Sequence, residues 1–123
     1  MDETKYSINL DTKFRPLELI DVQGLVDACT ERWYNQTLSQ VNDCVVRLGI
    51  LEGEFHWHKH NEEDELFFVL DGRLLIDLEG RTVTLGPQQG LMVPKGVNHR
   101  TRAPEKTVLL MMEASTVQPT GDD

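Results

Sequence analysis

Cysteine is scarce in this chain. Only Cys29 and Cys44 occur among its 123 residues, and they form neither a C-x-x-C pair nor the spacing of a zinc knuckle. This scarcity excludes a disulfide scaffold. It predicts instead two buried thiols in a reducing compartment.

Long apolar runs and an excess of positive charge are also missing. No stretch approaches the roughly 20 apolar residues that a membrane-spanning helix needs. The chain has 12 Lys and Arg residues and 21 Asp and Glu residues, which gives a net charge of −9. This charge opposes binding to nucleic acid and to anionic membranes. It does not oppose a small anionic molecule, because a metal ion and a few arginines can reverse the field locally. We therefore expect a small-molecule partner, no nucleic acid and no membrane.

The start of the chain does not resemble a secretory signal. Met1 is followed by two acidic residues, whereas a signal begins with basic residues and continues as an apolar run. We therefore expect a cytoplasmic protein. Its length predicts one domain, and a domain of this size can bury a core without disulfide support.

The first third of the chain predicts an arm and a helix. Residues 1–20 have no clear periodicity and are expected to be extended. Asp21 has the character of an N-cap. A helical spacing of apolar residues follows it: Val22, Leu25, Val26, Cys29 and Trp33. We predict that this helix packs on a sheet, so that residues 1–43 form an N-terminal arm and helix.

From residue 44 the pattern changes to short strands separated by turns, of which Asp71-Gly72 is a strong hairpin signal. The expected strands are 44–51, 55–60, 65–70, 73–78, 81–85, 91–94, 98–103 and 107–113. About eight short strands at regular spacing favour an antiparallel sandwich or barrel. The sequence thus predicts an all-β barrel over 44–114 and a frayed polar tail over 115–123.

Three of the four histidines fall within five residues, at His56, His58 and His60. Alternation along a strand places them on one face. Two of them can approach one metal, and Glu65 and His99 can complete the site. Such nitrogen and oxygen ligands suit one divalent iron, manganese, nickel, cobalt or zinc ion. The lack of thiolates argues against a closed structural zinc site. The spacing alone leaves two pairs open, His56 with His58 or His58 with His60.

Two longer motifs carry a family resemblance. His58-x-His60, then Glu65 and Gly72, is similar to the first cupin motif, and Pro94-x-Gly96-x-x-His99 is similar to the second. Over residues 44–114 the chain resembles the short single-domain microbial cupins, of the conserved-barrel, mannose-6-phosphate isomerase-like kind. The resemblance implies a double-stranded β-helix, or jelly roll. It also implies a metal held by His58, His60, Glu65 and His99, and so favours the second histidine pair.

Three positions depart from the family pattern. Four rather than five residues lie between Gly53 and His58, Gln88 replaces a glycine before Pro94, and Ala103 replaces the closing asparagine. None of these residues is an expected metal ligand. We expect the departures to affect the loops rather than the metal centre.

Other residues are candidates for the wall of a pocket. Phe67 and Val69 share a face with Glu65 and predict an apolar wall. His56 is either a residue of the pocket wall or outer shell, or a half-exposed strand histidine. Guanidinium groups can bind an anionic ligand, and the candidates for this role are Arg47, Arg100 and Arg102.

The resemblance implies several functions. A metalloenzyme acting on a small polar molecule, of isomerase or dioxygenase type, is the first hypothesis, with substrate at an open metal position. No Lys, Asp or Tyr stands out as a base, so no catalytic residue is assigned. A barrel that binds a sugar or an acid without turnover, and a barrel whose metal only stabilises it, are the alternatives. Small cupins often pair, and we expect a homodimer built on apolar residues: Trp57, Leu66, Phe68, Leu70 and the arm over 6–20.

Overall fold

The computed structural model describes residues 6–122; the first five residues of the predicted arm and Asp123 lie outside this range. Its elements are β1 (Ser7–Asn9), α1 (Val22–Ala28), β2 (Trp33–Val41), β3 (Cys44–Glu54), β4 (Glu65–Asp71), β5 (Leu74–Leu78), β6 (Arg81–Leu85), β7 (Gly90–Val93) and β8 (His99–Ala114). The predicted all-β fold with one N-terminal helix is confirmed. No helix within the described range is long and apolar enough to cross a membrane.

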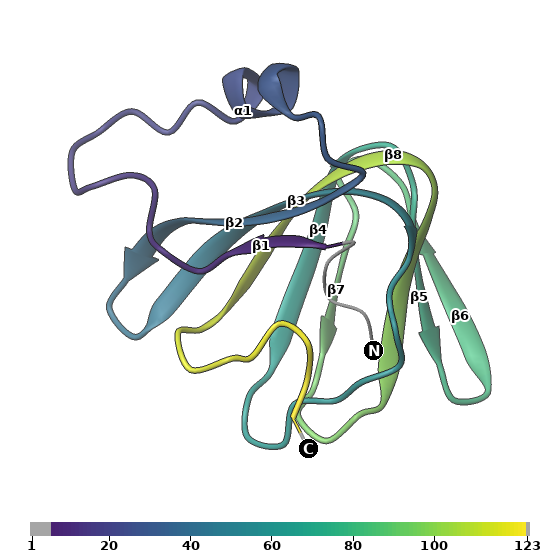
Figure 1. Cartoon of the computed structure of the whole chain (residues 1–123). Coiled ribbons are helices and arrows are strands. Elements are labelled where there is room, and N and C mark those ends of the chain that lie inside the picture. Colours follow the sequence, from purple (N-terminus) through teal and green to yellow (C-terminus); the bar gives the residue numbers. More distant parts are fainter. Residues whose placement is uncertain (1–5, 123) are drawn as a thin grey trace.

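The eight strands form one curled sheet (Figure 1). Its order is β1-β2-β3-β8-β4-β7, and the β5–β6 hairpin joins it through β8. All pairs are antiparallel except β1 with β2. Because β8 pairs with β3, β4 and β5, it links the two halves of the barrel.

The strand β8 corrects one prediction. Two strands were expected over 98–103 and 107–113, but the chain runs through both as one strand of 16 residues. The register against β3 shifts between Leu51 and Gly53, which pair with Thr107 and Ala103. The extra residues on β8 are absorbed as a bulge, which bends a strand without ending it.

Strand β2 is a second correction, since residues 33–41 were assigned to the arm and helix. The helix begins as predicted, because the Asp21 carboxylate accepts a hydrogen bond from the N–H of Gly24 at 3.0 Å. It ends at Ala28, however, and Trp33 begins β2 instead of continuing the helical stripe. Three consecutive buried polar residues conceal the apolar alternation of this strand: Asn35, Gln36 and Thr37.

The helix packs on the outer face of the sheet, as predicted. Val22, Leu25, Val26 and Cys29 contact the cluster around Leu48 of β3. Cys29 is partly buried, but Cys44 is exposed at the start of β3, so the prediction of two buried thiols is wrong for Cys44.

The inner face of the sheet carries the larger core and the functional site. In β4, Glu65, Phe67 and Val69 are buried, whereas the residues between them are partly exposed. The inner core includes the aromatic residues Tyr6, Trp33, Phe55 and Phe67. This alternation brings Glu65 into the interior beside aromatic side chains.

Two segments near the site differ from their predictions. Residues 55–60 were expected to form a strand but make only an isolated bridge, between His58 and His99. The tail was expected to be frayed, yet Val117 is buried, and the N–H of Asp122 donates to the carbonyl of Lys59 at 2.9 Å. The tail therefore folds back against the histidine segment.

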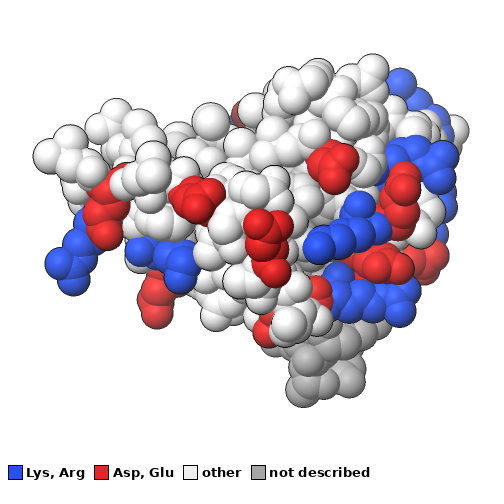
Figure 2. Space-filling model, turned by 90° about the horizontal axis from the view of Figure 1, so that it is seen from above, with Lys and Arg blue, Asp and Glu red and all other residues white. Residues whose placement is uncertain are grey.

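Charged side chains are mixed on the face shown in Figure 2, where the Lys and Arg side chains gather mainly at one end with acidic side chains between them. Arg100 and Arg102 illustrate such pairing, because both donate to the carboxylate of Asp77, at 2.7 and 2.6 Å. The hydrogen bond from Arg102 is the main reason that the pKa of Asp77 lies well below its usual range. These two arginines are engaged with Asp77, in contrast to the anion-binding role considered for them.

Candidate metal centre

The two cupin-like motifs meet through backbone hydrogen bonds. The N–H of His58 donates to the carbonyl of His99, and the N–H of His99 donates to the carbonyl of His58, both at 2.9 Å. This reciprocal pair is the isolated bridge between the loop after β3 and the start of β8. It brings side by side two histidines that lie 41 positions apart in the sequence.

Other backbone contacts position His60 and Glu65. The carbonyl of His60 accepts from the N–H of Gly96 at 2.7 Å. Gly96 has φ +80°, a conformation that favours glycine in a tight turn. Glu65 is the first residue of β4 and is paired with strands on both sides, opposite Val93 and Glu113. The second motif thus holds His60 while the sheet fixes Glu65.

The structure brings together the four predicted ligands. His58, His60, Glu65 and His99 each offer a ligand atom, and these atoms all lie within 4.8 Å of one another. Oε1 of Glu65 lies 3.3 Å from Nε2 of His60 and 3.5 Å from Nε2 of His99. These three atoms are buried and have no hydrogen-bond partner. Buried polar atoms normally have partners, and a metal ion would supply one here, so the residues fit a metal.

Backbone carbonyls orient two of the imidazoles. Nδ1 of His58 lies 3.0 Å from the carbonyl of His56, and Nδ1 of His99 lies 2.9 Å from the carbonyl of Val97. In the neutral tautomer that donates from Nδ1, Nε2 keeps its lone pair. Such contacts commonly orient metal-binding histidines. His58 and His99 are therefore held ready to bind through Nε2.

His56 takes a different place. It is not part of the four-residue cluster, and its Nε2 lies 2.6 Å from the carbonyl of Thr120 in the tail. Its side chain is partly exposed, and its own carbonyl orients His58. Of the two pairs left open by spacing, the structure assembles His58 with His60, and His56 instead links the site to the tail.

The surroundings of His58 and His60 shift the pKa values of these two histidines in opposite directions. Burial, and next His99, lower the pKa of His58 to about 4. Burial alone would lower the pKa of His60 as well, but the interaction with Glu65 outweighs it and the pKa is raised. Burial alone would raise the pKa of Glu65, yet His60 and His99 bring it well below its usual range. Without a metal, a proton therefore binds His60 before His58, and Glu65 stays ionised.

Metal affinity is expected to fall as the pH falls. Below the raised pKa of His60 a metal must displace one proton, so affinity should drop about tenfold per pH unit. Near pH 4 protonation of His58 also begins, and the slope should steepen towards about a hundredfold per unit. Competition with a chromophoric chelator across this range measures the slope. Affinity that is independent of pH between 4 and 7 would contradict ligation by these imidazoles.

A buried hydrogen-bonded pair, Arg47 and Glu113, lies behind Glu65. Nη1 of Arg47 is 3.1 Å from Oε1 of Glu113, and the Arg47 Nε donates to the hydroxyl of Thr37 at 3.1 Å. Both side chains are almost fully buried. Burial, and then the charge of Glu65, raise the pKa of Glu113 above its usual range. Arg47 is therefore not a free anion clamp in the pocket, as the sequence suggested, because Glu113 and Thr37 already engage it.

Glu113 also lies beside the site, although it was not among the residues predicted from the sequence. The available signal was the alternation of the last strand, in which Met111 and Glu113 share a face. Pairing of β8 with β4 then places Glu113 directly opposite Glu65. A glutamate on the inner face of a strand, beside a metal ligand, is an outer-shell candidate.

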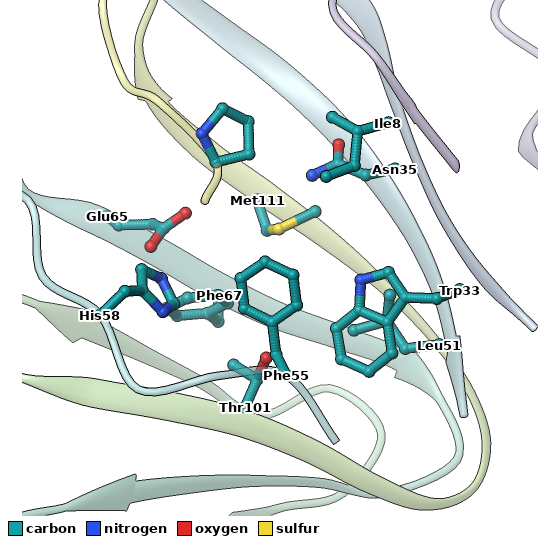
Figure 3. A pocket seen from close by; sticks show the side chains of 11 residues that line it. Ile8, Trp33, Asn35, Leu51, Phe55, His58, Glu65, Phe67, Thr101 and Met111 are labelled. Atoms are coloured by element: carbon teal, nitrogen blue, oxygen red, sulfur yellow. The ribbon is translucent and has the colours of Figure 1, made fainter. Parts of the chain in front are cut away.

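A mainly apolar pocket adjoins the metal site (Figure 3). The pocket is open to solvent, and its lining consists of Ile8, Trp33, Asn35, Leu51, Phe55, His58, Glu65, Phe67, Thr101, Met111 and Pro119. His58 and Glu65 lie on one side and Asn35 on the other (Figure 3). Phe67 lines the pocket as predicted. Val69 is fully buried in the inner core and does not reach the lining.

The tail closes over His58. Pro119 lines the pocket, and the N–H of Asn61 donates to the Asp122 carboxylate at 2.8 Å. Gly121 has φ +95°, and a Cβ atom built on it would lie only 2.5 Å from Cβ of His58. Any larger residue must therefore push the tail away from the histidine.

We expect Gly121→Ala to detach the tail while the barrel stays folded. The added methyl group meets His58 at a position where the backbone is already in the left-handed region. Hydrogen exchange should show faster exchange at the N–H groups of Asn61 and Asp122, with unchanged exchange in β3 and β8. Gly80→Ala is the matched control, because Gly80 also has positive φ but no atom within 4 Å of its added Cβ. Equal protection of the tail in both variants would contradict this packing.

Comparison with known proteins agrees with the fold and the motifs. The cupin domain family matches residues 45–114. The uncharacterized protein YdbB of Bacillus subtilis is 46% identical over 91 residues, which cover 73% of this chain and 80% of YdbB. The polyketide synthase CurC of Streptomyces cyaneus is 45% identical over 47 residues, but these cover only 38% of this chain and 29% of CurC.

A solved structure supports the same relationship. The cupin-2 domain protein of Shewanella frigidimarina superposes with a TM-score of 0.74 and is 30% identical, covering 78% of this chain and 94% of that one. The family match spans more than half of the chain and includes all four clustered residues. The protein therefore belongs to the cupin domain family.

Proposed function

We propose that this cupin is a metal-dependent enzyme that acts on a small molecule bound at an open position of one divalent metal. The observation that carries the proposal is the buried cluster of His58, His60, Glu65 and His99, which borders a pocket. Four protein ligands leave one or two positions free on iron, manganese, nickel or cobalt. CurC, which is named a polyketide synthase, supports a role in small-molecule metabolism.

Each part of the chain has a distinct task in such an enzyme. A bound metal would polarise a substrate oxygen or provide the place where substrate and dioxygen meet. The four ligands hold that centre on the inner face of the sheet. Trp33, Phe55 and Phe67 exclude water from the pocket and orient the apolar part of a substrate. The tail covers the side of His58 and limits access to it.

The pocket lining favours the dioxygenase type over the isomerase type. An isomerase that moves a proton needs a base close to the substrate. Among the residues described as lining the pocket, the only ionisable side chains are His58 and Glu65, and both belong to the metal cluster. A reaction in which dioxygen attacks the bound substrate depends less on a separate base.

Oxygen uptake tests the proposal. Protein loaded in turn with iron, manganese, nickel and cobalt is supplied with catechols, diketones and hydroxylated aromatic acids. We expect uptake with at least one metal and substrate, and none with His99→Ala. Sugar phosphates, assayed for isomerisation, test the other reaction type. Binding without turnover across the whole panel would favour the alternative of a non-catalytic sugar- or acid-binding cupin.

We also propose that two copies of the chain pair. Met92 of β7 and Met112 of β8 are each 49% exposed and flank Leu66 on the outer face of β4. Strand β7 is the last in this part of the sheet. An exposed apolar row at a sheet edge favours association. Trp57, also expected at the interface, is 43% exposed and lies against the guanidinium of Arg100.

We expect sedimentation equilibrium at micromolar concentration to give twice the monomer mass of 14.1 kDa. Met92→Lys/Met112→Lys should shift the equilibrium to the monomer, because two ammonium groups would have to be desolvated at the interface. The matched control is Val41→Lys, at an exposed apolar position of β2 outside the proposed interface. A wild-type protein that sediments at 14.1 kDa would defeat the proposal.

A further inference from the structure

Asn35 has a buried carboxamide oxygen without a partner. The residue is 7% exposed, and no hydrogen bond is formed by its Oδ1. The side chains next to it are satisfied: Nε2 of Gln36 donates to the carbonyl of Asp11 at 2.9 Å, and the hydroxyl of Thr37 accepts from Arg47. Burying a polar atom without a partner is costly and rare. Asn35 is therefore an exception within its own strand.

The position of Asn35 in the pocket indicates that its missing hydrogen-bond partner belongs to a ligand. Asn35 lines the pocket, and it lies across the pocket from His58 and Glu65 (Figure 3). A molecule that extends from the metal side through the pocket would reach the carboxamide with its far end. The unsatisfied oxygen therefore points to a hydrogen-bonding group on the ligand.

The walls between these two ends are flat and apolar. The rings of Trp33 and Phe55 are stacked, with centroids 5.3 Å apart and planes inclined by 13°. Phe67, Leu51 and Met111 line the same space (Figure 3). Such surfaces accommodate a planar ring. No Lys or Arg belongs to this lining, so the body of the ligand has no cationic partner there.

We propose that the pocket binds a hydroxylated aromatic compound, with its ring among Trp33, Phe55 and Phe67 and its hydroxyl group hydrogen-bonded to Asn35. A hydroxyl group both donates and accepts, so it can satisfy the carboxamide in either orientation of its oxygen and nitrogen. The contact of the opposite end with the metal rests on the proposed function. Binding of the ring by the apolar walls, and of the hydroxyl group by Asn35, does not depend on the proposed function.

Phenol and toluene are the matched probes, because they have nearly the same shape and differ by the hydroxyl group. Both are titrated by calorimetry into the full-length wild-type protein and into Asn35→Leu, in which an apolar side chain of similar shape replaces the carboxamide. The phenol-to-toluene affinity ratio should fall about two- to tenfold in Asn35→Leu, which is the effect of losing one hydrogen bond. The matched control is Gln40→Leu, because Gln40 is an exposed amide of the same strand; it should leave the ratio unchanged.

The melting temperature provides an independent readout. If Asn35 serves a ligand, Asn35→Leu without probe should melt at the wild-type temperature or above it, because the variant no longer buries an unpaired oxygen. If Asn35 serves the fold, the variant should melt lower. Asn35→Ala tests the affinity ratio a second time should the leucine variant not fold.

The outcomes separate this proposal from the proposed function. An affinity ratio that stays unchanged in Asn35→Leu or Asn35→Ala overturns the hydroxyl contact, even if the metal-loaded protein consumes oxygen. Absence of phenol and toluene binding at millimolar concentration overturns the aromatic pocket as well. If the affinity ratio falls as expected but the protein shows no turnover, the aromatic pocket is supported and only the proposed enzymatic function is contradicted.

Discussion

Replacing His99 by alanine is expected to abolish stoichiometric metal binding, whereas replacing His56 should leave about one ion per chain. His99 is almost fully buried, its Nδ1 is held by the carbonyl of Val97, and its unpartnered Nε2 faces Glu65. Removing it leaves two imidazoles and one carboxylate. His56 lies in the same segment as His58 and His60 but outside the cluster, so it serves as the matched control.

Elemental analysis of the variants, purified in parallel without added metal, decides this prediction. Circular dichroism ensures that each variant is folded before its metal content is compared. His60→Ala is the informative third variant, because it separates the two histidine pairs. If His56→Ala loses the metal and His60→Ala keeps it, the assignment of the ligands is wrong by one strand repeat.

Arg47→Met is expected to lower the free energy of unfolding by about 1–3 kcal/mol, because the buried carboxyl group of Glu113 and hydroxyl group of Thr37 lose the hydrogen bonds that Arg47 donates. Glu113 would then face Glu65 across the β4–β8 ladder with no cation beside it. Two carboxyl groups would share a buried site from which Arg47 had been removed. Urea unfolding at neutral pH, in the absence of metal, measures the loss.

The double variant Arg47→Met/Glu113→Leu is the control for this effect. Removing both members of the pair is less costly than removing Arg47 alone, because no buried carboxyl group is left without its hydrogen-bond donor. The double variant should therefore recover most of the lost stability. A single variant that loses less than about 0.5 kcal/mol, below the value of one ordinary hydrogen bond, would contradict the structural importance of this pair.

The local patterns of the barrel were sufficient to predict most of its strands. The strand over 81–85 coincides with β6, and the turn at Gly72 has the positive φ that its hairpin signal implied. Motif spacing likewise predicted the four residues of the cluster. These features depend on residues that are close in sequence or on two motifs of fixed spacing, which a sequence displays directly.

At Gln88 the loop keeps a backbone conformation typical of glycine, although this departure from the family pattern was expected to alter the loop. Gln88 replaces a glycine, yet it adopts φ +66°, in the region that favours glycine. Its N–H donates to the carbonyl of Val69 at 2.9 Å, and the N–H of Val69 donates to the carbonyl of Gln89. These hydrogen bonds hold the loop in a conformation that the side chain alone would disfavour.

The features that escaped prediction depend on distant contacts. Strand β2 was missed because its inward-facing residues include Asn35 and Thr37, whose burial depends on the pocket and on Arg47. The partner of Arg47 lies 66 residues away, at Glu113. The tail is polar, and it is held through Thr120 and Asp122 by segments far from it in sequence. The local periodicity of apolar residues in the sequence does not indicate contacts between such distant segments.

Anomalous diffraction from crystals of the protein purified without added metal shows directly whether His58, His60, Glu65 and His99 bind one metal ion. Data collected on both sides of the absorption edges of iron, cobalt, nickel and zinc, with a manganese fluorescence scan, identify the ion. We expect one strong peak per chain, about 2.0–2.3 Å from the Nε2 atoms of His58, His60 and His99 and from a carboxylate oxygen of Glu65. Its unfilled coordination positions should face the pocket that Asn35 lines. No anomalous peak among these four side chains, in crystals of metal-supplemented protein as well, would contradict metal binding at this cluster.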